Sequence, residues 1–173
     1  MKIEVVESNS KWLEKFDTEK IQLKKCLGDL VESIHHIGST AVPGMAAKPI
    51  IDIMIEVYSL DALDKLSPMM ESLGYEVKGE FGIPGRRYFR KGGVIRSHQI
   101  HAFKVGDNNI KRHIAFRDYL KSHSDVAKEY ANLKKSLVKT CNYDIDRYCD
   151  GKDAFIKNYE SIAIRWMKKY SGE

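Results

Sequence analysis

The spacing of hydrophobic positions along the chain changes near residue 107. Before it, short apolar runs alternate with turn-rich stretches, and two segments have the three- and four-residue spacing of an amphipathic helix. After it, only the helical spacing remains. The pattern predicts a single α+β domain over 1–173, with a mixed β-sheet flanked by helices in about 1–107 and a helical C-terminal region in about 108–170.

The same pattern predicts the individual elements. Strands are expected over 3–6, 31–37, 48–57, 75–79, 86–91 and 95–105. Helices are expected from a cap at Ser10 to about residue 30, over about 60–73, and around 110–120, 126–137 and 155–170, the last capped by Asp150. No linker or repeat divides the chain, which is why one domain is predicted.

One carboxylate interrupts the predicted strand 48–57. Asp52 lies between Ile51 and Ile53, in a segment whose alternation indicates burial. A lone carboxylate there needs a partner, because burying an unpaired charge is costly. Lys48 or an arginine would make a structural ion pair, whereas a metal ion would make a functional site.

A glycine-hydroxyl turn precedes that strand. Gly38, Ser39 and Thr40 lie between an apolar run and a short helical turn, and twelve residues separate Ser39 from Asp52. Glycine lets the backbone approach a phosphate closely, and the two hydroxyls add donors. Such a tripeptide is more often a plain turn, but its position before Asp52 favours phosphate binding.

Composition narrows the partners. The net charge of +5, from 29 basic and 24 acidic residues, favours anionic partners, although a solvated surface also explains so small an excess. No apolar run reaches the length of about 20 residues that a membrane span needs, so no membrane partner is expected. Three widely spaced cysteines without a C-x-x-C pair, and charges at positions 2 and 4, predict a cytoplasmic protein.

Four basic residues fall within 86–91, interleaved with two aromatic ones. In a strand, Arg86 and Arg87 point to opposite faces. An arginine fork suits phosphate oxygens, and a neighbouring ring can stack on a base. A charged edge strand is the structural alternative. Arg87 is the first candidate for phosphate binding and Arg86 the second, because the sequence does not assign the face.

Several blocks of the sequence resemble a known family. The hallmark of the GrpB family is similar to 36–44 (HIGSTAVPG) followed by 46–53 (AAKPIIDI). The likeness continues through 85–90, 98–101, 112–120 and 129–134, and so covers nearly the whole chain. The family belongs to the nucleotidyltransferase superfamily and is similar to the C-terminal extension of some bacterial dephospho-coenzyme A kinases. The resemblance implies a nucleotidyltransferase-like fold.

The superfamily implies a divalent metal site as well. Its members carry two carboxylates one residue apart on the strand after the Gly-Ser turn, where they share divalent ions. Asp52 matches the first position and would anchor Mg²⁺ or Mn²⁺ in catalysis. Met54 occupies the second, and a thioether is a poor magnesium ligand. Glu56 lies roughly 13 Å from Asp52 along the strand, too far to replace it, and is expected in a salt bridge.

Three further residues are candidates for this site. His101 could face Asp52 from the neighbouring strand and ligate a metal, although a packing role is equally compatible; for His98 hydrogen-bonded packing is the preferred interpretation. Related nucleotidyltransferases hold the triphosphate with a lysine from a helical region, and Lys134 is the counterpart here. Lys48 could reach a phosphate or Asp52.

The sequence leaves three functions open. The first is a protein that binds a nucleotide or another phosphorylated small molecule, extending to metal-dependent nucleotidyl transfer with an atypical metal site. The alternative is a non-catalytic module that binds a nucleotide or coenzyme A precursor. RNA binding comes last, because the charge excess is modest and no recognised RNA-binding motif is present. The acceptor, the metal and the oligomeric state are left open.

Overall fold

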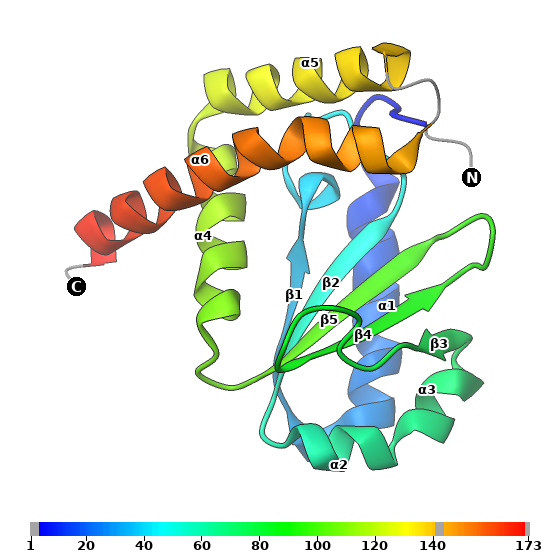
Figure 1. The fold of residues 1–173 in the computed structure, drawn as a ribbon. Coiled ribbons are helices and arrows are strands. Elements are labelled where there is room, and N and C mark those ends of the chain that lie inside the picture. The colour runs from blue at the N-terminus through cyan, green and yellow to red at the C-terminus, as the bar shows by residue number, and fades with distance from the viewer. Residues whose placement is uncertain (1–3, 141–143, 172–173) are drawn as a thin grey trace.

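Five strands form one mixed sheet in this computed structural model, which describes residues 4–140 and 144–171 (Figure 1). The order is β1-β2-β5-β4-β3. The strands are β1 (Val31–Ile37), β2 (Ile51–Val57), β3 (Tyr75–Val77), β4 (Arg86–Lys91) and β5 (His98–Lys104). β2 pairs with β5 in parallel, and the other neighbours are antiparallel. The predicted class, a mixed sheet flanked by helices with a helical C-terminal region, is confirmed.

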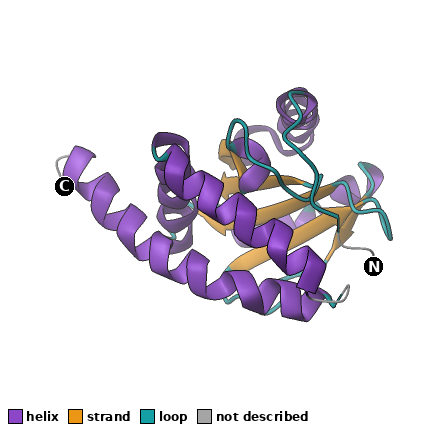
Figure 2. Ribbon diagram, turned by 90° about the horizontal axis from the view of Figure 1, so that it is seen from above, coloured by secondary structure: helices purple, strands orange, loops and turns teal. Residues whose placement is uncertain are grey.

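Helices cover both faces of the sheet. The helices are α1 (Lys11–Leu27), α2 (Leu60–Lys65), α3 (Ser67–Ser72), α4 (Asn108–Ser122), α5 (Ser124–Thr140) and α6 (Ile145–Ser171). Seen from above, the strands lie between one helix viewed end-on, α1, and the long helices of the C-terminal region on the other side (Figure 2). Within the described residues, no helix is both long and apolar enough to cross a bilayer.

The alternation in β2 sets the two faces. Ile51, Ile53 and Ile55 are fully buried in the main core, which α1 joins through Trp12 and Leu23. The other residues of the strand, including Asp52, point to the opposite face. Met54 is buried there in a smaller cluster with Ile37, Phe103 and Ile110, between the sheet and α4. Asp52 therefore faces the C-terminal helices.

Strand ends differ from the prediction for physical reasons. β2 begins at Ile51 and not at residue 48, because Pro49 has no amide donor and the amide of Ile50 bonds to the carbonyl of Lys48 at 2.7 Å. β5 begins at His98, after a glycine turn. The predicted strand 3–6 is wrong over its described part, where Val6 forms only an isolated bridge to Ala47; residue 3 lies outside the described residues.

Three helix predictions also need correction. The helix expected over 60–73 is divided at Leu66 into α2 and α3, with Pro68 in the first turn of α3, where its missing amide is harmless. Ser10 makes no side-chain cap bond. Asp150 lies inside α6 and does not cap it; the cap is Asp144, whose Oδ1 accepts from the amides of Asp146 (3.0 Å) and Arg147 (3.3 Å).

Candidate functional site

A cavity of about 220 Å³ lies between the sheet and the C-terminal helices. Its walls are the turn after β1, the segment leading into β2, the facing side chains of β2 and β5, and the helices α4, α5 and α6. Six predicted site residues line it: Gly38, Ser39, Thr40, Lys48, Asp52 and Lys134. The structure thus brings residues of the N-terminal half together with a lysine from the helical region. We call this space the lysine cavity.

The turn at the cavity begins with a glycine in the left-handed region. Gly38 has φ +72° and precedes a 3₁₀ turn over Ser39–Ala41. Because Ile37 pairs with Asp52 across β1 and β2, the turn lies directly against the carboxylate. A Cβ on Gly38 would approach Asp52 Oδ2 to 3.0 Å and Asp52 Cβ to 3.2 Å. Only glycine fits this backbone without displacing Asp52.

Thr40 anchors the other end of the turn. His36 Nε2 and Thr40 Oγ1 lie 2.9 Å apart, and the threonine hydroxyl donates to the carbonyl of Ile50 at 3.5 Å. The hydroxyl therefore accepts from the imidazole. Burial against Phe16 lowers the pKa of His36 to about 4, so its ring is neutral near pH 7. Thr40 ties β1 to the start of β2.

Lys134 reaches the turn from α5. Its Nζ donates to Ser39 Oγ at 2.7 Å and lies 4.5 Å from the ring centroid of Tyr130. The side chain is only 2% exposed. Burial, assisted by repulsion from Lys152 and Lys48, lowers its pKa to about 7. A buried lysine held at a hydroxyl is arranged to meet an anion.

Two further lysines face the same space. Lys48, from the segment before β2, and Lys152, from α6, lie 5.3 and 5.0 Å from the ring centroid of Tyr148. Burial lowers the pKa of both side chains, and the charge of Lys152 lowers that of Lys48 further. Among the described residues, no carboxylate forms an ion pair within 4.0 Å with Lys48, Lys134 or Lys152. The cavity thus holds positive charge in excess.

Two carboxylates line the cavity. Glu160 lies 3.4 Å from Arg112 Nε through its Oε2, so its charge already has a partner. Asp52 receives a hydrogen bond from His101 Nε2 at 2.7 Å. Burial works against ionisation of Asp52, but the neighbouring His101 outweighs it, and the pKa of Asp52 lies below its ordinary value. Asp52 is therefore charged at neutral pH.

Arg86 fixes the orientation of that histidine. Its Nη1 lies 3.3 Å from His101 Nδ1, and its other nitrogens donate to the carbonyls of Glu80 (3.2 Å) and Phe81 (2.8 Å). Since a guanidinium only donates, His101 Nδ1 accepts and Nε2 carries the hydrogen that Asp52 receives. The chain Arg86–His101–Asp52 holds the carboxylate in one position.

The donor set does not fit a magnesium site built from the protein. Both ring nitrogens of His101, a predicted metal ligand, already have partners, and Met54 is buried under Phe103. Over residues 4–140 and 144–171, no three His, Cys, Asp or Glu side chains gather as a ligand group. Magnesium prefers several oxygens in octahedral geometry, and Asp52 offers one carboxylate already engaged by His101.

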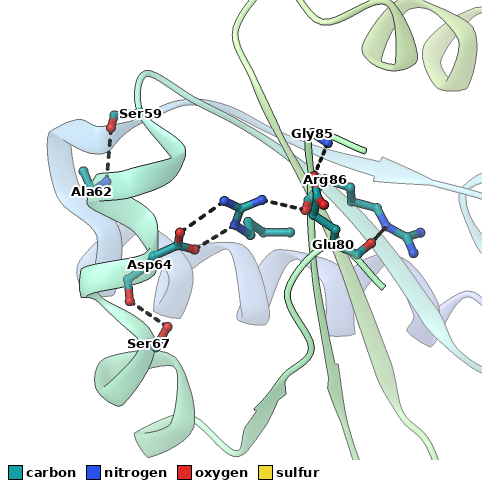
Figure 3. Close-up of polar contacts among 8 residues, drawn as sticks. Ser59, Ala62, Asp64, Ser67, Glu80, Gly85 and Arg86 are labelled. Atoms are coloured by element: carbon teal, nitrogen blue, oxygen red, sulfur yellow. Dashed lines mark hydrogen bonds and ion pairs between the residues drawn. The ribbon is translucent and has the colours of Figure 1, made fainter. Parts of the chain in front are cut away.

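Arg87 lies away from the lysine cavity. Its Nε and Nη2 donate to the two carboxylate oxygens of Asp64, on α2, at 2.8 and 3.2 Å. Asp64 sits on the helix side of this bridge, while Arg86 turns toward Glu80 (Figure 3). The sequence could not assign the faces of the two arginines. The structure places Arg86 on the face of Asp52 and Arg87 on the opposite face, so Arg86 is the arginine with a role near Asp52.

Two residues near the candidate site, Glu56 and His98, were predicted to have structural roles. Glu56 Oε2 lies 2.5 Å from His35 Nε2, across β1 and β2, as the expected salt-bridged glutamate. His98 Nδ1 lies 2.8 Å from Ser97 Oγ, and its other nitrogen is 3.8 Å from the buried Glu19. His98 therefore faces α1, on the side of the sheet opposite to His101.

Sequence reasoning missed part of the lining. The lining residues that were not predicted as site residues are Ile37, Ala47, Ile50, Gln99, His113, Phe116, Tyr130, Tyr148, Lys152, Ile156 and Glu160. Most of them come from the C-terminal helices. Tyr148 and Lys152 are one helical turn apart, a spacing that would have placed them on one face. The signal was lost because the helix was expected to begin only after Asp150.

The sheet, the glycine turn and the facing aspartate define a nucleotidyltransferase-like fold. A mutant of the Cid1 poly(U) polymerase bound to MgATP matches with a TM-score of 0.51 and 16% identity, over 76% of this chain and 45% of that chain. Identity at this level shows the fold alone.

The chain belongs to the GrpB family. The family model for GrpB protein matches residues 2–161. Similar proteins include the UPF0157 protein YqkA of Bacillus subtilis (strain 168), 50% identical over 96% of this chain. The crystal structure of conserved protein GrpB from Enterococcus faecalis is 42% identical, with a TM-score of 0.92 over 95% of this chain and 99% of that chain. The resemblance seen in the sequence is confirmed.

Two of the similar proteins are longer than this chain. The alignment covers 49% of YqkA, so the chain spans about half the length of that relative. A dephospho-CoA kinase of Mycobacterium leprae (strain TN) is 26% identical over 94% of this chain and 46% of that protein. The domain therefore also resembles part of a larger enzyme.

Proposed function

We propose that this protein binds a nucleotide or another phosphorylated small molecule in the lysine cavity. The observation that carries the proposal is that three lysines, Lys48, Lys134 and Lys152, surround one small space. Among the described residues, none of the three forms an ion pair with a carboxylate within 4.0 Å. Burying unpaired charges of one sign costs stability. An anionic ligand supplies the missing partner.

The charges of the cavity indicate the charge of the ligand. With Glu160 paired to Arg112, Asp52 is, among the described lining residues, the carboxylate left to oppose the three lysines. An excess of two positive charges, present when all three lysines are protonated, matches a phosphate monoester, which carries about −1.5 to −2 near pH 7. A phosphate oxygen beside Lys134 Nζ and Ser39 Oγ, which are 2.7 Å apart, would contact both.

The fold and the relatives support the nucleotide class. A mutant of the Cid1 poly(U) polymerase binds MgATP on a similar fold. The chain is also similar to part of a dephospho-CoA kinase, an enzyme whose name contains a coenzyme A precursor. Together they support a nucleotide-related function in general. The size of the cavity favours a small ligand over RNA, which would need an extended basic surface.

Metal-dependent nucleotidyl transfer is the second candidate. The position of Asp52, facing the turn at Gly38, favours it. The poor fit of the side chains to Mg²⁺ or Mn²⁺ weighs against it, because His101 engages Asp52 and Met54 takes the second carboxylate position. We therefore place ligand binding without a required metal first.

A thermal-shift screen with nucleotides and coenzyme A precursors, each with and without Mg²⁺ or Mn²⁺, tests both candidates. A ligand at about 100 times its Kd should raise Tm by roughly 5–10 °C, with or without metal, because it binds only the folded state. In Asp52→Asn that shift should persist. Stabilisation by a nucleoside triphosphate only with metal, lost in Asp52→Asn, would instead support the transferase.

The screen has a matched control in Arg87→Gln. Arg87 lies on the other side of the sheet, bound to Asp64, so the ligand-induced shift of this variant should equal that of the unchanged protein. If no phosphorylated compound of the panel moves Tm, with or without metal, the proposal fails for both candidates.

Binding should weaken as the pH rises through 7. The pKa of Lys134 is lowered to about 7, so the side chain is mostly charged at pH 6 and mostly neutral at pH 8. If only the charged form binds, affinity falls about tenfold over this range. Inorganic sulfate is a suitable calorimetric probe, because its own charge stays constant there. An unchanged Kd between pH 6 and pH 8 would contradict the role given to Lys134.

A further inference from the structure

A second cavity of about 320 Å³ adjoins the lysine cavity. It is lined by Glu4, Lys48, Pro49, Ile50, Val94, Ile95 and Arg96. The two cavities share Lys48 and Ile50 as a common wall. Apart from Lys48, Glu4 and Arg96, the lining of the second cavity is apolar. We call it the apolar groove.

The outer wall of the apolar groove is the tip of the β4–β5 hairpin, which extends from the sheet in Figure 1. Val94 and Ile95 at this tip are 84% and 87% exposed. Two adjacent β-branched side chains so open to solvent contribute nothing to the core. Exposed apolar residues beside a cavity mark a binding surface more often than isolated ones do.

The hairpin holds this tip in a defined shape. Gly92 has φ +105°, and a Cβ there would lie 2.3 Å from the carbonyl oxygen of Ile95. The amide of Ser97 closes the turn by donating to the carbonyl of Lys91 at 2.9 Å. Val94 and Ile95 are therefore presented by a tight turn whose backbone is fixed at both ends.

We infer that the ligand of the lysine cavity is a phosphate ester with an uncharged, apolar substituent that lies in the apolar groove. The inference rests on the proposed function. The phosphate meets Lys134 and Ser39, and the substituent passes Ile50, which belongs to both cavities, and reaches Val94 and Ile95. The shared wall is the reason for assigning one ligand to both spaces.

The distribution of charge supports this orientation of the ligand, with the phosphate in the lysine cavity and the substituent in the apolar groove. Lys48 and Arg96 are the cationic residues of its lining, and Lys48 belongs to the wall shared with the lysine cavity. The positive charge is therefore greatest in the lysine cavity, where Lys134 and Lys152 lie near Lys48, and an anionic group is expected to bind there. The hairpin end, with Val94 and Ile95, offers contact to a group without charge.

A series of n-alkyl phosphates tests this assignment. Ethyl, butyl and hexyl phosphate are titrated into the full chain by calorimetry at pH 6.5. The affinity should rise about twofold for each added methylene, half the free energy of a completely buried one. In the double variant Val94→Ser/Ile95→Ser the affinity for ethyl phosphate should stay the same, and the rise with chain length should disappear.

Both substituted side chains are largely solvent-exposed, so the double variant should fold. A matched control is Leu13→Ser/Ile21→Ser, which changes two exposed apolar residues of α1 and should keep the dependence on chain length.

Three outcomes would overturn the inference. Ethyl and hexyl phosphate binding equally to the unchanged protein would leave the lysine cavity as a phosphate site and remove the groove from it. A chain-length dependence that survives in Val94→Ser/Ile95→Ser would place the substituent elsewhere, against Tyr130 or Phe116. If no alkyl phosphate and no inorganic phosphate binds, the proposed function itself fails.

Discussion

Lys134→Met should make the protein more stable and at the same time unable to hold its ligand. We expect the free energy of unfolding at pH 7 to rise by roughly 1–3 kcal/mol, because methionine keeps an apolar stem of similar length and removes a buried charge. The affinity for phosphorylated ligands should fall about 10- to 150-fold, since a hydrogen bond from a charged donor is lost.

The pH dependence of the free energy of unfolding tests whether the buried charge of Lys134 is the cause of the expected stabilisation. The pKa of Lys134 is about 7 in the folded chain and 10.5 ordinarily, so between these values the unfolded chain binds the additional proton. Folding stability contributed by this group therefore rises with pH from 7 to 10.5. Chemical denaturation at pH 6, 8 and 9.5 should show this rise in the unchanged protein and a smaller one in Lys134→Met.

Lys128→Met is the control on the same helix. Lys128 is exposed, and its substitution should change stability by no more than about 0.5 kcal/mol and ligand affinity not at all. If Lys134→Met instead unfolds at lower denaturant than the unchanged protein, Lys134 supports the structure through Ser39 and Tyr130, and the argument for an anion site is lost.

Gly38→Ala should have the largest destabilising effect among substitutions in the turn. The added Cβ meets Asp52 Oδ2 at 3.0 Å and Asp52 Cβ at 3.2 Å, on a backbone with φ +72° and ψ −172°. A conformation that is nearly exclusive to glycine and a contact with a fixed side chain together should cost roughly 2–4 kcal/mol. Urea denaturation followed by circular dichroism measures this loss.

Gly44→Ala separates the two causes. Gly44 also has positive φ, +76°, but no atom lies within 4 Å of a Cβ placed there. It should therefore lose only the backbone part, about 1–2 kcal/mol. Equal losses at Gly38 and Gly44 would show that the contact between the turn and Asp52 is unimportant, and would weaken the case that the pair forms one site.

The sequence predicted those features that depend on local spacing. The alternation around Ile53 predicted β2 and placed Asp52 on the face opposite to the isoleucines, as the structure shows. Strands were also predicted over 75–79 and 86–91, and β3 and β4 form there as an antiparallel pair. Boundaries were less accurate where a cap decides them, as at Asp144, because several polar residues near a helix start can accept amide bonds equally well.

The spacing of hydrophobic and polar residues could not predict features that depend on which elements pack together. Arg86 and Arg87 could be assigned to opposite faces but not to a named face, since that requires knowing that α2 brings Asp64 to Arg87. The lysine cluster was visible only in part. Lys134 entered by likeness to related enzymes. Lys152 was missed because Tyr148, one turn before it and also in the cavity lining, lay outside the helix that was expected to begin after Asp150.

The three lysines belong to parts of the chain that are distant in sequence and meet only in the folded domain. Lys48 precedes β2, Lys134 is on α5, and Lys152 is on α6. Their repulsion therefore acts between the sheet and the helices that cover it. If an anion binds in the lysine cavity, it removes this repulsion and should hold those parts together, so local opening between α6 and the sheet should be rarer in the loaded protein than in the empty one. In a cell, resistance of the protein to proteolysis would then follow the supply of its ligand.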